Sequence, residues 1–164
     1  MVKKYPLDTP TLLPTFIGSW MIDNLVCDEL IAYYEKNKIK QTQGITSKGI
    51  DLETKNRTDI CVNPKDILLP NNEIFKSYFK ILFECYEDYN LQWPFLSSMV
   101  SKLEIGKFNV GKYLPGQHFQ KLHTERTSLN TLHRLFAFMS YLNDVEDGGS
   151  TYFNHYDLEI KPQK

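Results

Sequence analysis

Two side chains that could bind a metal lie two residues apart in the segment His123-Thr124-Glu125. Residues i and i+2 of a β-strand point to the same face, so a strand here would bring the imidazole and the carboxylate together. With a second histidine from another strand, they would form the 2-His-1-carboxylate triad of non-haem Fe(II) oxygenases. That triad leaves coordination positions open for a cosubstrate and for oxygen. Alone, the triplet is a weak signal, because it arises often by chance.

The other residues capable of chemistry have ordinary structural interpretations. His118, His133 and His155 are interpreted as surface or loop residues, with a surrogate ligand role for His155 as the minor alternative. The three cysteines are far apart, odd in number and without zinc-type spacing. They therefore indicate reduced thiols in a reducing compartment.

The net charge and the lengths of the apolar runs exclude some classes of function. The chain has 164 residues, and 19 Lys+Arg against 20 Asp+Glu give a net charge of −1. This balance argues against nonspecific nucleic-acid binding through a broad basic surface. Prolines interrupt the N-terminal segment, and the longest apolar run, Leu135–Met139, is too short to span a bilayer. We therefore predict a soluble intracellular protein, cytoplasmic in the simplest case, with neither nucleic acid nor membrane as a partner.

Apolar spacing predicts the elements of the first half of the chain. Apolar residues at helical intervals predict one helix over 23–38 and a second over 72–90. Residues 40–70 combine glycines and prolines with many polar residues, which predicts an irregular stretch with short strands. Residues 1–22 are rich in proline and are predicted to form an extended strand or loop.

The second half of the chain has the pattern of short strands. The continuous apolar run Leu135–Leu142 predicts a strand buried on both faces. Apolar and charged residues alternate over 156–160, which predicts a half-exposed strand. Helices followed by short strands indicate an α+β fold with a sandwich or barrel of the jelly-roll type.

The surroundings of the His-Thr-Glu triplet carry a family resemblance. The relevant segments are Tyr113-Leu-Pro-Gly116, His123-Thr-Glu125, Arg134 leading into Tyr141-Leu-Asn143, and Gly148-Gly-Ser-Thr151-Tyr-Phe153. In order and spacing they resemble the prolyl 4-hydroxylase-like branch of the Fe(II)/2-oxoglutarate-dependent dioxygenases. The resemblance is strong over residues 100–164 and loose over 15–95.

The resemblance implies a fold and a set of site residues. It implies one domain over 1–164, in which residues 1–95 form a helical support region and 96–164 form the first part of a double-stranded β-helix, or jelly roll. His123 and Glu125 would bind Fe(II), although the family more often has aspartate at the second position. The residues implied to contact the cosubstrate are Tyr113, Tyr141 and Thr151. No catalytic residue beyond the metal site is implied.

The implied activity is hydroxylation of an unactivated C–H bond, coupled to conversion of 2-oxoglutarate and O2 into succinate and CO2. The cofactors would be Fe(II) and 2-oxoglutarate, with ascorbate as the reductant that restores oxidised iron. The substrate would be a peptide or a small molecule, with a peptidyl proline as the default by analogy.

The sequence departs from the family pattern at its C-terminal end. It ends at Lys164, before the distal histidine ligand, the basic residue that anchors 2-oxoglutarate and the last strands. We therefore expect either a fragment of a longer protein or a shortened gene product. Two alternatives stay open: a noncatalytic or degenerate jelly-roll binding module without a complete iron site, and a cupin-like metalloenzyme that does not use 2-oxoglutarate.

Overall fold

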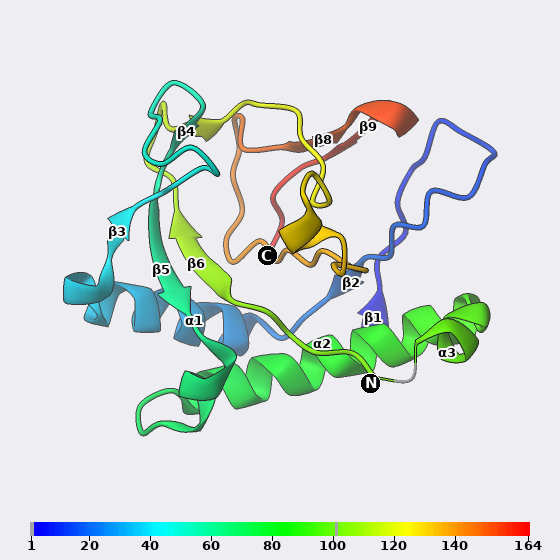
Figure 1. Ribbon diagram of the computed structural model, residues 1–164, viewed down its shortest axis with the longest axis horizontal. Coiled ribbons are helices and arrows are strands. Elements are labelled where there is room, and N and C mark those ends of the chain that lie inside the picture. Colours follow the sequence, from blue (N-terminus) through cyan, green and yellow to red (C-terminus); the bar gives the residue numbers. More distant parts are fainter. Residues whose placement is uncertain (1, 101) are drawn as a thin grey trace.

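A computed structural model describes residues 2–100 and 102–164 (Figure 1). The described residues form a mixed α/β structure with three α-helices and small antiparallel sheets. The α-helices are α1 (Asn24–Lys36), α2 (Glu73–Gln92) and α3 (Phe95–Met99). Short 3-10 helices span Lys38–Lys40, Pro64–Leu68, Leu129–Thr131 and Asn154–Tyr156.

Helix α1 confirms the helix predicted over 23–38. The Asp23 carboxylate accepts a hydrogen bond from the backbone N–H of Leu25 at 2.9 Å, which caps the first turn. The helix ends at Asn37, whose side-chain amide donates to the Tyr33 carbonyl at 2.8 Å. The buried face repeats at helical intervals and consists of Val26, Cys27, Leu30, Tyr33 and Tyr34. Asp23 therefore fixes the start of α1, and the apolar stripe fixes its orientation.

Helix α2 confirms the helix predicted over 72–90. It has 20 residues and buries Phe75, Tyr78 and Cys85. Its N-cap residue, Asn72, is buried and donates its side-chain amide to the Asp66 carbonyl at 2.6 Å. That bond attaches the start of α2 to the preceding 3-10 helix. In the described part of the chain, neither α2 nor any other helix combines the length and the apolarity needed to cross a membrane.

The described strands pair in four antiparallel sheets of two or three strands. The largest has the order β3 (Thr42–Gln43), β5 (Thr58–Val62) and β6 (Phe108–Lys112), with Ile60 opposite Val110. The two-stranded sheets pair β1 (Lys3–Lys4) with β2 (Trp20–Met21), β4 (Lys55–Asn56) with β7 (His118–Phe119), and β8 (Thr151–Phe153) with β9 (Leu158–Ile160). The described helices and strands confirm the expected mixture of helices and short strands. The described strands do not close into a barrel.

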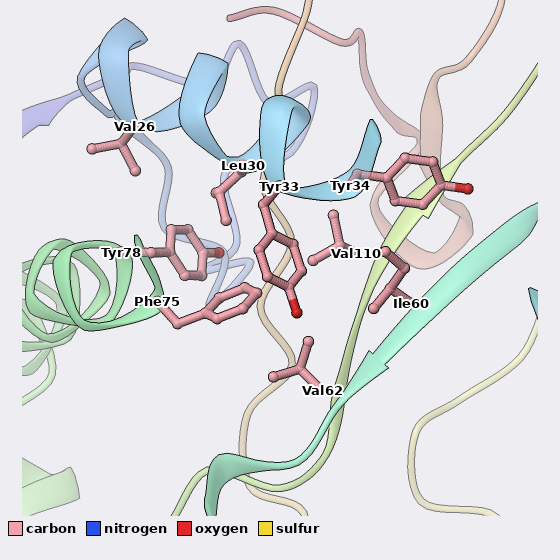
Figure 2. Packing of buried hydrophobic residues seen from close by; sticks show 9 residues of the cluster. All are labelled: Val26, Leu30, Tyr33, Tyr34, Ile60, Val62, Phe75, Tyr78 and Val110. Carbon is pink, nitrogen blue, oxygen red and sulfur yellow. The ribbon is translucent and has the colours of Figure 1, made fainter. Parts of the chain in front are cut away.

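The core lies between the two long helices and the β5–β6 pair (Figure 1). Figure 2 shows its nine buried residues: Val26, Leu30, Tyr33, Tyr34, Ile60, Val62, Phe75, Tyr78 and Val110. Phe75 is fully buried, and its ring meets Tyr33 and Phe108 edge-on at centroid distances of 4.8 and 5.4 Å. Edge-to-face pairs add to the stabilisation that burial already provides. Aromatic rings from α1, α2 and β6 therefore hold the helices against the sheet.

The strand predicted over Leu135–Leu142 is wrong. The structure gives this segment no regular secondary structure, and Leu135, Phe136 and Phe138 are about two-fifths exposed. A strand needs a neighbour for its backbone hydrogen bonds, and none of the described strands pairs with this segment. The apolar side chains still pack on one side, since Phe136 contacts the rings of Tyr86 and Tyr89 on α2.

The strand predicted over 156–160 is shorter than expected. Tyr156 ends a 3-10 helix, and Asp157 adopts a left-handed conformation with φ of 49° before β9 begins at Leu158. The phenolic hydroxyl of Tyr152 donates to the Asp157 carboxylate across this turn. The alternating pattern therefore predicts β9 correctly but includes the turn that precedes it.

The three cysteines differ in exposure, which predicts a labelling pattern. Cys27 and Cys85 are buried, whereas Cys61 lies on β5 and is exposed. Burial raises the pKa of the Cys85 thiol to about 11 and also raises the pKa of Cys27, so little reactive thiolate forms at pH 8. We expect one thiol per native chain to react rapidly with a disulfide reagent at pH 8, and three in urea. Rapid reaction of all three in the native chain would contradict this burial.

Candidate functional site

His123 and Glu125 approach each other in an irregular segment that follows β7, and not in a strand. The His123 Nε2 atom lies 3.6 Å from Glu125 Oε1. Both side chains are between two-fifths and one-half exposed, so an ion from solvent can reach them. The convergence expected of these two residues therefore occurs, although a bent backbone produces it.

Neighbouring groups orient both side chains. His123 Nδ1 lies 2.8 Å from the Lys121 carbonyl, which can only accept a hydrogen bond, so Nδ1 carries the hydrogen of the neutral imidazole. The lone pair of Nε2 then faces Glu125. The Phe119 ring stacks on the imidazole at a centroid distance of 4.6 Å, and Arg134 Nη1 donates to Glu125 Oε2 at 2.9 Å. Contacts with Lys121, Phe119 and Arg134 therefore hold the imidazole and the carboxylate in place.

The gap has the size expected of two ligands on one metal ion. Donor atoms about 2.1 Å from an ion lie about 3 Å apart at a right angle and about 3.4 Å apart at a tetrahedral angle. The observed 3.6 Å is close to the upper value. Within residues 2–100 and 102–164, no group of three His, Cys, Asp or Glu side chains is placed to hold a metal. The described residues therefore bring two candidate ligands, His123 and Glu125, within 3.6 Å of each other and add no third.

Tyr141 and Thr151, both expected near the cosubstrate, are in contact. The Tyr141 hydroxyl donates to Thr151 Oγ1 at 2.6 Å and lies 3.2 Å from the Ile160 carbonyl oxygen of β9. Burial raises the pKa of Tyr141 by more than the hydrogen bonds to Thr151 lower it. Tyr141 therefore remains protonated at neutral pH and can act as a hydrogen-bond donor.

Tyr113 contacts a charged cluster that sequence reasoning did not assign to the site. Arg57 Nη1 donates to the Tyr113 hydroxyl at 2.9 Å, and the guanidinium lies 5.3 Å from the ring centroid. Two cations form ion pairs with the Asp59 carboxylate: Arg57 Nε lies 2.8 Å from Oδ1, and Lys55 Nζ lies 3.3 Å from Oδ2. The Arg57 Nε–H does not point at Oδ1, so that contact is an ion pair without a hydrogen bond. Lys55, Arg57 and Asp59 are charged residues at every second position of the chain. In an extended segment such residues point to the same side, and this spacing was the signal in the sequence that could have grouped them.

The charged cluster of Lys55, Arg57 and Asp59 lies between the His123–Glu125 pair and Tyr113. Lys55 Nζ lies 5.5 Å from the centroid of Phe119, the same ring that stacks on His123. At its other end, Arg57 contacts Tyr113. Residues from β4, β5, β7 and the segment after β6 therefore form one continuous set of contacts.

The remaining histidines do not join the pair formed by His123 and Glu125. His118 Nε2 lies 3.1 Å from the Glu53 carbonyl, which accounts for one of its ring nitrogens. His133 is exposed just after the Leu129–Thr131 helix, and His155 is exposed in the turn before β9. His133 and His155 therefore have surface or turn positions, whereas His118 is half-buried in β7, opposite Asn56 of β4.

Comparison with known proteins adds no family to this geometry. No family model, no curated protein and no solved structure matches the chain.

Proposed function

We propose that this chain is an Fe(II)- and 2-oxoglutarate-dependent dioxygenase of the prolyl 4-hydroxylase-like type, which hydroxylates an unactivated C–H bond. One observation carries the proposal: His123 Nε2 and Glu125 Oε1 face each other at 3.6 Å, with Nδ1 of the same imidazole hydrogen-bonded to a carbonyl. A histidine whose other ring nitrogen is hydrogen-bonded to a carbonyl is typical of metal ligands, and this supports the proposal. In this proposal the small sheets packed on α1 and α2 are the first part of a jelly roll.

Each neighbouring residue has a defined role in the proposal. His123 and Glu125 bind Fe(II), which, together with 2-oxoglutarate, supplies the oxygen activation that no side chain can provide. Arg134 fixes one carboxylate oxygen of Glu125 and leaves the other for the metal. Phe119 covers one face of the imidazole and excludes water from it. Tyr113, Tyr141 and Thr151 line the cosubstrate side.

A second function is a noncatalytic binding module. The observation that favours it is that, among the described residues, only two metal-ligating side chains converge, and both are partly exposed. Two ligands hold Fe(II) weakly against water and competing chelators. The two functions therefore differ in whether the folded chain binds a metal and converts 2-oxoglutarate.

The test combines a metal-binding measurement with a turnover measurement. The first records the electron paramagnetic resonance signal of Mn²⁺, as a substitute for Fe(II), titrated with the chain and 2-oxoglutarate. The second measures succinate formed from 2-oxoglutarate with Fe(II), ascorbate and air. We expect the wild-type chain to bind Mn²⁺ and to form succinate. His123→Ala should lose Mn²⁺ binding and succinate formation, whereas the control variant His133→Ala, at an exposed position, should keep both activities. A folded chain that does neither would contradict the dioxygenase proposal.

A further inference from the structure

The segment Leu135–Leu142 lies extended along helix α2. Phe136 contacts the ring of Tyr86 on that helix. Four residues later, the Ser140 hydroxyl oxygen lies 2.8 Å from that of Tyr78. The two helix residues are about 12 Å apart along the helix axis. Four residues cover such a distance when the backbone is extended, at about 3.4 Å per residue, so the segment has the reach of a β-strand.

The backbone of this segment has no partner strand. Within residues 2–100 and 102–164, its N–H and carbonyl groups form no hydrogen bond with another backbone group. Residues 135–139 are all exposed, so a strand from outside can reach them. An extended apolar segment with unpaired backbone groups is a template for an added strand, which supplies the missing hydrogen bonds.

The exposed surface of the chain is larger than that of a compact monomer. It amounts to 12148 Å² for a mass of 19.2 kDa, whereas a folded monomer of this mass exposes about 8,400 Å². The excess of about 3,700 Å² is well above the roughly 800 Å² that each partner buries in a stable interface. Phe136, Phe138 and Met139, which are 39%, 41% and 57% exposed, place part of this surface on the segment.

Charges at the two ends of the segment favour a second copy of this chain as the partner. Arg134 precedes the segment, Asp144 follows it, and no charged residue lies between them. In an antiparallel pair of two copies with Met139 opposite itself, Arg134 of each copy lies opposite Asp144 of the other. A parallel pair in register would place like charges opposite each other, which is unfavourable. Arg134 uses Nη1 for Glu125, and its guanidinium has further N–H donors for a second carboxylate.

We propose that the segment Leu135–Leu142 forms the interface of a symmetric dimer, in which it pairs antiparallel with the same segment of a second copy, centred on Met139. A two-fold axis at this position makes the interface self-complementary. Phe136 of one copy then lies opposite Leu142 of the other, and both side chains stay on the side that faces their own α2 helix. The proposal does not depend on metal binding or catalysis.

The first test is the oligomeric state of the chain. Sedimentation velocity of the wild-type chain at micromolar concentrations is expected to show a particle of twice 19.2 kDa that dissociates on dilution. Met139→Lys places two ammonium groups opposite each other at the two-fold axis and should raise the dissociation constant of the dimer by at least about 10-fold. Leu129→Lys, at a position that is 86% exposed and outside the segment, is the matched control and should dimerise like the wild type.

A mixture of two variants tests the register of the pairing. Met139→Glu alone should weaken the dimer as Met139→Lys does, because it places two carboxylates opposite each other. An equimolar mixture of the two variants should form a heterodimer, in which the introduced ammonium lies opposite the introduced carboxylate. Recovery of the dimer in the mixture is expected only when position 139 of one copy lies beside position 139 of the other. Folded variants whose mixture recovers no dimer would reject this register.

Two further results would overturn the proposal. One is a wild-type chain that stays monomeric up to its solubility limit. The other is a folded Met139→Lys variant that dimerises as tightly as the wild type. Hydrogen exchange provides an independent measurement, since the amides of residues 135–142 should exchange more slowly in the dimer than in the diluted monomer. Equal protection in both states would show that the chain covers the segment itself, and would also reject the proposal.

A charge exchange keeps the proposal testable if Met139→Lys does not fold. Asp144 is exposed, so Asp144→Arg is compatible with a folded monomer. In the dimer, Asp144→Arg places two guanidinium groups opposite each other and should weaken association by at least about 10-fold. Adding Arg134→Asp to the same chain restores opposite charges across the interface and should restore the dimer. A folded Asp144→Arg variant that dimerises like the wild type would contradict the proposed pairing.

Discussion

Replacing Asp59 with asparagine is expected to lower the free energy of unfolding by about 3–5 kcal/mol, the cost of removing one partner from a buried ion pair. Asp59 is the shared counterion of Lys55 and Arg57, and its side chain is 7% exposed. Without it, two cations remain with little access to water. The strand that carries Asp59 also contributes Ile60 and Val62 to the core, so the loss will affect the whole sheet.

Urea unfolding followed by tryptophan fluorescence measures this effect. Glu35→Gln is the matched control, because it removes the carboxylate of an exposed ion pair with Lys112 on the neighbouring strand. Exposed pairs contribute little to stability, so the midpoint of the control should stay near that of the wild type. Equal midpoints for Asp59→Asn and Glu35→Gln would show that the buried cluster does not stabilise the sheet.

Replacing Phe75 with alanine is expected to cost about 3–5 kcal/mol of unfolding free energy. The Phe75 ring is fully buried on α2 and contacts the rings of Tyr33 and Phe108, so its removal leaves a cavity between α1, α2 and β6. Phe83→Ala, on the same helix but 58% exposed, is the control and should lose much less. Urea titrations measure the free energy of unfolding of both variants. Similar losses in Phe75→Ala and Phe83→Ala would contradict the burial of Phe75 in the core.

The two long helices could be predicted because their information is local. In α1 and α2, apolar residues recur at the period of a helix, and the capping residue Asp23 stands directly before the first turn. The segment Leu135–Leu142 shows the opposite case. Its apolar composition predicted burial, but a strand depends on a partner that composition does not specify. The structure accordingly places these side chains on α2 without forming a strand.

The candidate site was predictable in part. His123 and Glu125 are two residues apart, a spacing that would bring their side chains together in a strand. In the structure the two side chains do approach each other, but an irregular, bent backbone brings them together. The cluster of Lys55, Arg57 and Asp59 was not assigned, because alternating charged residues normally form a solvated strand face. Their burial depends on Gly44 and Gly111, which come from segments distant in the sequence.

The pairing of β5 with β6 also determines the order in which the chain can fold. Residues 62 and 108 adjoin across this ladder, so the entire α2 helix belongs to the loop that the pairing closes. Closing a long loop has an entropic cost before any contact compensates for it, and non-local strand pairs slow folding for that reason. Helix α2 needs only local contacts and shortens the loop as it forms. We therefore expect the sheet that carries Asp59 to be completed after helix α2 has formed.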